Sequence, residues 1–216
     1  MKCIILGGSG LVGQQLLQQA LTNPLLTSVI APTRKALTAH PKLLNPIVDF
    51  ADLPEDADWW NADIVLCALG TTMKLAGSKE RFFEIDHDYV MRAATLARQA
   101  GTPVFVYNSS LGANAAATSF YLQFKGQLEQ NLEKLGFRSL GIVRPSFLDG
   151  GARPDKRPGE AVAIAIAKSF EPLLPKRYRA VSTSKVASAM WKLAMKPEAG
   201  VTVVESDTIY AQAELK

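Results

Sequence analysis

Short apolar runs alternate along the chain with longer segments in which apolar residues recur at helical spacing. The apolar runs predict strands at residues 2–6, 28–31, 46–48, 63–69, 102–108, 137–143 and 201–205. The helical spacing predicts helices at residues 11–21, 79–100, 118–135, 160–170 and 184–195, with stop signals at Gly101 and Gly136 and a loop at 153–159. Buried strands that alternate with helices form a parallel sheet covered on both faces. The pattern therefore predicts an α/β fold with a doubly wound parallel sheet.

The length of 216 residues suits one domain with a sizeable core. We expect residues 1–216 to form this domain, with a small C-terminal lobe at about 146–182, where the alternation loosens. The longest wholly apolar run, at 161–167, is far shorter than the ~20 residues of a membrane span. Residues 1–6 read as a buried strand and not as a secretory leader. These features predict no membrane partner and a cytoplasmic location.

Cysteine and histidine are scarce in this chain. Cys3 and Cys67 lie in apolar runs, where a free thiol packs as a small hydrophobic side chain. Together with His40 and His87 they form no zinc-ligand spacing, and no carboxylate cluster is visible. We therefore expect no metal site.

The net charge of +4 is mild and too diffuse to indicate a nucleic-acid partner. Basic residues gather between 153 and 179, where Lys and Arg outnumber Asp and Glu. One interpretation is a solvated basic face. The other is a pocket rim that attracts an anionic substrate or a cofactor phosphate.

The first predicted strand runs into a glycine-rich turn at residues 7–13, and a helix follows directly. The glycines satisfy G-x-G-x-x-G, in which residues without Cβ let the backbone approach a pyrophosphate at the positive end of a helix. This strand–turn–helix setting is the one that the motif requires. The turn predicts a Rossmann-type fold and dinucleotide contacts from Gly7, Gly10, Leu11, Val12 and Gly13.

Two other motifs share part of this spacing. A P-loop needs Lys followed by Ser or Thr where Gln14 and Gln15 stand. A nucleophile elbow, G-x-S-x-G, needs glycine at the position of Leu11. The turn is therefore interpreted as a dinucleotide site.

The end of the second strand normally selects the cofactor. An acidic side chain there bonds the ribose hydroxyls of NAD, whereas a basic one suits the 2′-phosphate of NADP. This chain has Thr33, Arg34 and Lys35 there and no acid. Arg34 can pair with a phosphate through two N–H groups, and Thr33 can donate a hydroxyl. We predict NADP(H), with a merely solvated loop as the alternative.

Two later strand ends add expected cofactor contacts. Asp49 follows the strand at 46–48, where a side chain can reach the adenine edge. Leu69, Gly70 and Thr71 follow the strand at 63–69, where the chain passes close to the ribose and needs a small residue.

Tyr121 and Lys125 form a Tyr-x-x-x-Lys pair on a predicted helix, and this spacing places both side chains on one face. A nearby ammonium favours the phenolate form of tyrosine, which suits acid–base work on a carbonyl or an alcohol. Ser109 and Ser110 lie just upstream, at the end of the strand at 102–108. A hydroxyl at that strand end can polarise a substrate oxygen.

Together these motifs resemble the short-chain dehydrogenase/reductase superfamily, and more narrowly its small atypical subgroup of Tat-interacting-protein-like NADPH-binding oxidoreductases. The resemblance spans about residues 2–197. The segments that carry it are residues 7–13, 48–50, 69–72, 86–90, 108–113, 121–126, 128–129, 144–145, 153–154 and 157–160.

The resemblance implies a role for each matching residue. Tyr121 would be the acid–base residue, and Lys125 would bind the nicotinamide ribose and tune Tyr121. Ser110 would polarise the substrate, with Ser109 as the alternative if the register is shifted by one residue. Pro145 and Ser146 would pass their backbone by the nicotinamide. Asp86 departs from the pattern, because many members carry asparagine near that position.

The resulting function prediction is an NADP(H)-dependent reductase of a small carbonyl compound, neutral or anionic, acting as a monomer or a homodimer. One alternative is an NADPH-binding sensor or scaffold with little turnover, although such a protein needs no phenol beside the nicotinamide. Another is a nucleotide-sugar epimerase, which Arg34 and the short C-terminal part disfavour.

Overall fold

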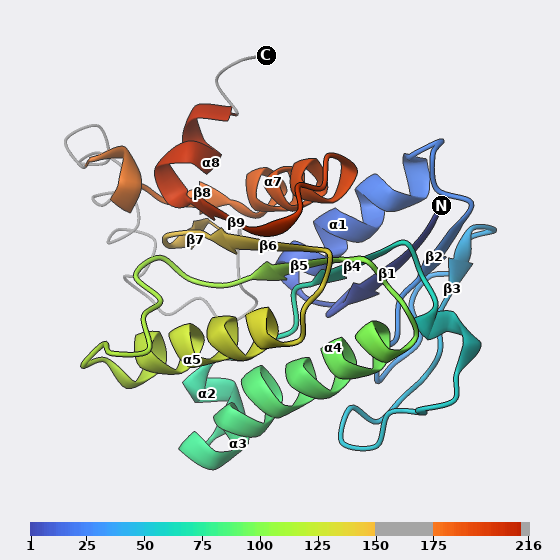
Figure 1. Cartoon of the computed structure of the whole chain (residues 1–216), viewed down its shortest axis with the longest axis horizontal. Helices are drawn as coiled ribbons and strands as arrows, with labels where there is room; N and C mark the ends of the chain where they lie inside the picture. The colour runs from blue at the N-terminus through green and yellow to red at the C-terminus, as the bar shows by residue number, and fades with distance from the viewer. Residues whose placement is uncertain (150–174, 213–216) are drawn as a thin grey trace, which may run out of the picture.

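A seven-stranded parallel sheet forms the centre of the computed structural model, which describes residues 1–149 and 175–212 (Figure 1). In spatial order its strands are β3 (Leu43–Leu44), β2 (Ser28–Ile30), β1 (Lys2–Leu6), β4 (Ile64–Cys67), β5 (Val104–Asn108), β6 (Ser139–Arg144) and β9 (Gly200–Glu205). All neighbouring strands are parallel, so their carboxyl ends lie along one edge. The predicted doubly wound α/β fold is confirmed.

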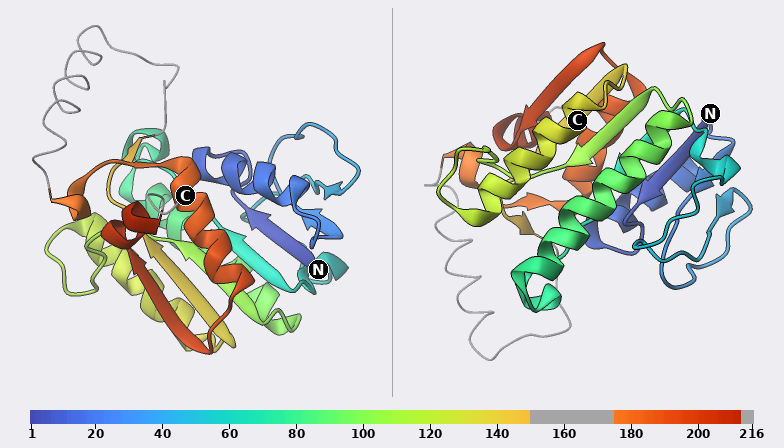
Figure 2. Two further views of the ribbon diagram at one scale, coloured as in Figure 1. Left: turned by 90° about the horizontal axis from the view of Figure 1, so that it is seen from above. Right: turned by 60° about the horizontal axis from the view of Figure 1, so that its bottom comes forward.

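Helices cover both faces of this sheet (Figure 2). One face carries α1 (Leu11–Thr22) and α7 (Thr183–Met195), and the other carries α4 (Tyr89–Gln99) and α5 (Phe120–Lys134). Strand β1 is apolar throughout because both of its faces are buried. Cys3 and Ile5 pack in the cluster with α1 and α7, while Ile4 and Leu6 pack in the cluster with α4 and α5.

The helix predicted at 79–100 is wrong as a single regular α-helix. It consists of α3 (Lys79–Phe83), a π-helical turn at Glu84–Asp88, and α4. The wide turn is closed by the Tyr89 N–H, which donates to the Glu84 carbonyl. The predicted stop signals are confirmed, because Gly101 and Gly136 follow α4 and α5 with φ of 90° and 67°.

The strand predicted at 46–48 is also misplaced. The paired strand is β3, three residues earlier, and only Ile47 of the predicted range forms a bridge, with Thr33. Pro46 has no N–H to donate and offers only its carbonyl, which accepts from Thr33 N at 3.0 Å. A continuous ladder is therefore interrupted at this edge of the sheet.

Several short elements were not predicted, because each is too short to show a helical or strand-like pattern of apolar residues. They are α2 (Met73–Ala76), α8 (Ser206–Gln212), 3₁₀ turns at Asp58–Trp60 and Lys176–Tyr178, and a second sheet of β7 (Leu148–Asp149) with β8 (Val181–Ser182). The predicted loop at 153–159, the predicted helix at 160–170 and most of the predicted lobe lie outside the described residues. Within residues 1–149 and 175–212, no helix has the length and apolar character to cross a membrane.

Candidate functional site

The predicted site residues follow the carboxyl ends of neighbouring strands. The chain turns from β1 into α1, and β1 lies between β2 on one side and β4 on the other. The order of the strands reverses at this point, which is where doubly wound sheets bind ligands. The glycine turn, the loop after β4 and the serines after β5 therefore come together on one edge of the sheet (Figure 1).

The glycines of the turn have two different roles: Gly7 and Gly13 allow close backbone packing, and Gly10 leaves space beside the turn. Gly7 has φ of 81°, and a Cβ there would lie 2.6 Å from the carbonyl oxygen of Ala68. A Cβ at Gly13 would lie 1.9 Å from the carbonyl oxygen of Gly7. These two glycines let the turn pack against the end of β4 and the start of α1. A Cβ at Gly10 would meet only the Gly7 carbonyl oxygen, at 3.3 Å, so Gly10 borders open space.

The first turn of α1 offers free amide donors to a ligand. Gly10 is the N-cap and provides no side-chain cap, and the first turn holds no acidic residue. The first intrahelical bond is from Gln14 N to Gly10 O, so the amides of Leu11, Val12 and Gly13 precede it. Amide donors at a positive helix end with no competing acid form a donor set that fits the pyrophosphate of a dinucleotide.

Arg34 is exposed on the loop after β2, and hydrogen bonds of its neighbour Thr33 fix the shape of this loop. The buried Thr33 hydroxyl donates to the Lys35 carbonyl at 2.7 Å and accepts from the Asn45 amide at 2.8 Å. Thr33 thus shapes the loop, and its hydroxyl is not free to donate to a ligand in this arrangement. Arg34 is exposed and has no ionic or hydrogen-bonding partner among the described residues.

Asn45 is a contributor to this loop that the sequence reasoning missed. Its amide nitrogen also donates to the Ala31 carbonyl, and its side-chain oxygen accepts from Leu37 N at 2.8 Å. The only available signal in the sequence was its place directly before Pro46. Asp49, expected near the adenine, is exposed and accepts from Ala51 N at 2.9 Å.

A buried polar cluster surrounds Lys125, which projects from α5. The Lys125 ammonium donates to Asp86 Oδ1 at 3.0 Å and to the Tyr107 hydroxyl at 2.7 Å. The side chains of Lys125 and Asp86 are only 4% and 2% exposed, so this ion pair is buried. Sequence reasoning noted Asp86 as a departure but could not foresee this contact, which joins residues 39 positions apart.

The electrostatics of this cluster keep Lys125 charged. Burial works to lower the pKa of Lys125, but the oxygens of Tyr107 and Asp86 outweigh it and raise that pKa above its ordinary value. Burial raises the pKa of Tyr107 well above its ordinary value, so its phenol stays neutral. Burial likewise raises the pKa of the nearby Cys67 thiol to about 12.

Tyr121 lies on the same side of α5 as Lys125, as the spacing predicted. The Lys125 nitrogen is 5.9 Å from the centre of the Tyr121 ring. The ring also packs against Phe82, with 6.0 Å between ring centres, yet Tyr121 stays 39% exposed. Its hydroxyl has no hydrogen-bond partner in the part of the chain that the structure describes. A phenol next to a buried cation is therefore open to a ligand.

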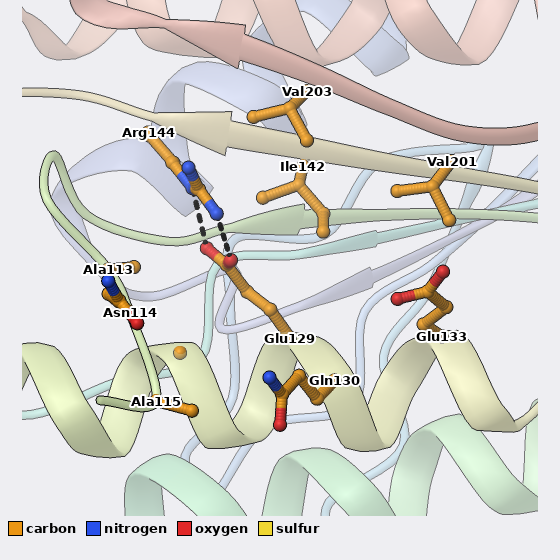
Figure 3. Close-up of a pocket in the computed structure, with 11 residues that line it drawn as sticks. Ala113, Asn114, Ala115, Glu129, Gln130, Glu133, Ile142, Arg144, Val201 and Val203 are labelled. Carbon is orange, nitrogen blue, oxygen red and sulfur yellow. Dashed lines mark hydrogen bonds and ion pairs between the residues drawn. The ribbon is translucent and has the colours of Figure 1, made fainter. Parts of the chain in front are cut away.

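The neighbouring serines differ in their surroundings. Ser109 is buried, and its hydroxyl donates to Glu129 Oε1 at 2.5 Å. Glu129 in turn pairs with Arg144 through two hydrogen bonds, at 3.0 and 2.5 Å, beside a pocket of about 370 Å³ (Figure 3). Ser110 is half-buried, and its hydroxyl has no partner within the described ranges. The free hydroxyl at this strand end is thus that of Ser110.

The remaining predicted contacts lie at the same edge. Leu69 is half-buried, and Thr71 N donates to Asp86 Oδ2 at 2.6 Å. A Cβ on Gly70 would come within 3.2 Å of Asp86 Oδ1, so glycine leaves room for that carboxylate. Pro145 is buried, and its carbonyl accepts from Leu111 N at 2.8 Å, which ties the ends of β5 and β6 together.

The basic stretch at 153–179, interpreted as a solvated face or as a pocket rim, is only partly described by the structure. Residues 153–174 lie outside the described part of the chain. Arg177 lies 3.8 Å from Glu205, and the Arg179 guanidinium lies 5.9 Å from the centre of the Tyr210 ring. The described part of this stretch therefore interacts with neighbouring side chains.

Named proteins resemble this chain along most of its length. Protein HTATIP2 of Rattus norvegicus is 35% identical over 201 residues, which cover 91% of this chain and 82% of that protein. Protein FMP52, mitochondrial, of Candida albicans is 35% identical over 176 residues, or 77% of this chain and 75% of that protein. The corresponding protein of Emericella nidulans is 34% identical over 172 residues, or 74% and 71%. No family model matches the chain.

Solved structures share the fold at low identity. MoeE5 in complex with UDP-glucose and NAD has a TM-score of 0.70 at 17% identity, covering 100% of this chain and 82% of that one. The oxidoreductase ylbE from Lactococcus lactis has a TM-score of 0.67 at 18% identity, covering 99% and 97%. UDP-glucose 4-epimerase from Thermotoga maritima has a TM-score of 0.67 at 17% identity, covering 96% and 77%. These likenesses confirm the Rossmann-type fold.

The fungal relatives correct one expectation. The proteins from Candida albicans and Emericella nidulans are both named mitochondrial. The expectation of a cytoplasmic location is therefore wrong. It rested on composition and on residues 1–6, and neither specifies a compartment within the cell.

Proposed function

Because the chain belongs to the atypical short-chain dehydrogenase/reductase family of HTATIP2 and Fmp52, we propose that it binds NADP(H) and reduces a small carbonyl substrate. The observation that carries the proposal is the buried Lys125 cation beside the exposed Tyr121 ring, on one face of α5. Asp86 and Tyr107 hold the Lys125 cation within reach of the exposed Tyr121 ring. This arrangement suits a phenol that must give up its proton.

The cofactor proposal rests on two parts of the sheet edge. The amides of Leu11, Val12 and Gly13 would hold the pyrophosphate, with Gly10 leaving room for it. Arg34, exposed on its fixed loop, would pair with the 2′-phosphate of NADP. A 2′-hydroxyl lacks the charge that Arg34 would recognise, so we propose NADP(H) over NAD(H).

The chemistry follows from the positions of three side chains. The bound cofactor would supply the hydride. Tyr121 would donate its proton to the carbonyl oxygen, and Lys125 would stabilise the phenolate that remains. Ser110, whose hydroxyl is free, would hold and polarise the same oxygen. Ser109 would support the strand end through Glu129.

Calorimetry followed by a substrate screen tests the proposal. NADPH should bind more tightly than NADH, and NADPH absorbance should fall in the presence of at least one compound of an aldehyde and ketone panel. Equal affinity for both cofactors would contradict the NADP(H) preference. NADPH binding without consumption by any compound would favour the sensor alternative over the reductase.

The epimerase alternative has less support. The sugar-nucleotide complex and the epimerase that share the fold are each only 17% identical to this chain, against 35% for HTATIP2. An added UDP-sugar that binds more tightly than simple carbonyl compounds would reverse this preference.

A further inference from the structure

Asp86 occupies an unusual place in the helical segment that connects β4 to β5. It lies in the π-helical turn at Glu84–Asp88, between α3 and α4, and it is 1% exposed. Such wide turns are rare, and they re-aim a side chain that a regular helix would direct elsewhere. A buried carboxylate is costly unless its oxygens find donors, so its partners indicate what it is for.

Each carboxylate oxygen of Asp86 binds a different element of the site. Oδ1 accepts from the Lys125 ammonium on α5 at 3.0 Å, and Oδ2 accepts from the Thr71 amide, in the loop after β4, at 2.6 Å. Gly70 leaves the space that this arrangement needs, because a Cβ there would come within 3.2 Å of Oδ1. One side chain thus bridges Lys125, expected at the nicotinamide ribose, and the loop after β4, expected close to a ribose of the cofactor.

The same contacts fix the direction of the Lys125 ammonium. Asp86 accepts one of its N–H groups, and the Tyr107 hydroxyl accepts another at 2.7 Å. An ammonium carries one more donor than these two acceptors use, and that donor remains for a ligand. Burial raises the pKa values of the nearby Tyr107 and Cys67, so both of these side chains stay neutral. Asp86 is the only carboxylate that pairs with Lys125 among the described residues.

From these contacts we propose that Asp86 is a positioning residue for the nicotinamide-ribose end of the cofactor site. Its carboxylate holds the Thr71 amide and the Lys125 ammonium at a fixed separation before a ligand arrives. This inference rests on the proposed NADP(H) function. It assigns Asp86 a direct ion-pairing role, where a neutral asparagine would leave the lysine cation uncompensated.

The test compares binding of the whole cofactor with binding of its adenosine half alone. Asp86→Asn keeps the shape of the side chain but replaces one acceptor oxygen with an NH₂ group, which cannot accept from Lys125 or from Thr71. Calorimetry measures the affinity of the parent and the variant for NADPH and for adenosine 2′,5′-bisphosphate, which contains no nicotinamide ribose. We expect NADPH to bind about tenfold or more weakly to the variant, while the bisphosphate changes by less than about twofold.

A control variant and a second test variant accompany Asp86→Asn. Asp88→Asn changes the same helical turn, where Asp88 is exposed and pairs with His87 among the described residues, and it should alter neither affinity. Asp86→Glu keeps the charge but moves the carboxylate by one methylene, and it should weaken NADPH selectively even if Asp86→Asn does not fold. Equal weakening of both ligands by a substitution of Asp86, or no weakening of NADPH by it, would overturn the positioning role. A parent protein that does not bind NADPH would instead overturn the proposed function, and this inference with it.

Discussion

Replacing Lys125 with methionine isolates the contribution of the buried ion pair to stability. Lys125→Met keeps an unbranched stem in a site that is 4% exposed and removes only the ammonium. Asp86 is then left as a buried charge whose remaining partner is the Thr71 amide, and the Tyr107 hydroxyl loses its donor. Breaking a buried pair in this way costs about 3–5 kcal/mol. That is a large part of the ~5–15 kcal/mol by which folded domains are stable.

Urea unfolding followed by circular dichroism, without cofactor, measures this loss directly. For a chain of this size it corresponds to a fall in Tm of roughly 6–20 °C. Lys134→Met, on the exposed side of the same helix, is the control and should stay within about 0.5 kcal/mol of the parent. Asp86→Asn combined with Lys125→Met removes both charges and keeps an acceptor for the Thr71 amide, so it should cost less than the sum of the single changes. A Lys125→Met protein within about 1 kcal/mol of the parent would refute the reasoning.

Three further predictions concern the cofactor site and the core. Arg34→Ala should weaken NADPH by about 1–3 kcal/mol and leave NADH unchanged, since only NADPH carries the 2′-phosphate; calorimetry with both cofactors checks this. Gly10→Val should abolish NADPH binding while the protein stays folded, because the added Cβ would approach only the Gly7 carbonyl oxygen, at 3.3 Å, and otherwise fills the ligand space. A folded variant that binds NADPH normally would place the pyrophosphate elsewhere. Burial raises the pKa of Cys67 to about 12 and that of Cys3 further, so neither thiol should react with an alkylating reagent at pH ~8 until the protein unfolds.

Local patterns predicted the parts of the fold that depend on local physics. The first strand, the glycine turn and α1 were found within one residue, because strand, turn and helix signals are contiguous there. The stops at Gly101 and Gly136 were found because a positive φ strongly favours glycine. The strand at 46–48 was misplaced because its apolar residues flank a proline, which cannot donate to a ladder.

The sequence predicted which residues belong to the candidate site, but not the hydrogen bonds and ion pair that connect them. Tyr121 and Lys125 were recognisable from spacing on one helix. The contacts of Lys125 with Asp86 and Tyr107 span 39 and 18 positions and depend on tertiary packing. The π-helical turn that carries Asp86 leaves no clear mark on apolar periodicity. Thr33 was expected to contact a phosphate, but only the fold shows its hydroxyl engaged with Lys35 and Asn45.

The central claim is that Tyr121 provides the proton for carbonyl reduction beside a bound NADP(H). The most direct measurement is the rate of NADPH oxidation by the parent and by Tyr121→Phe, with a substrate found in the carbonyl panel and with NADPH affinity determined in parallel. Removing the phenol oxygen should lower turnover by about 10²–10⁴ and leave NADPH affinity within about twofold, because the exposed hydroxyl would contact substrate and not the phosphates. A Tyr121→Phe protein that retains full turnover would contradict the account.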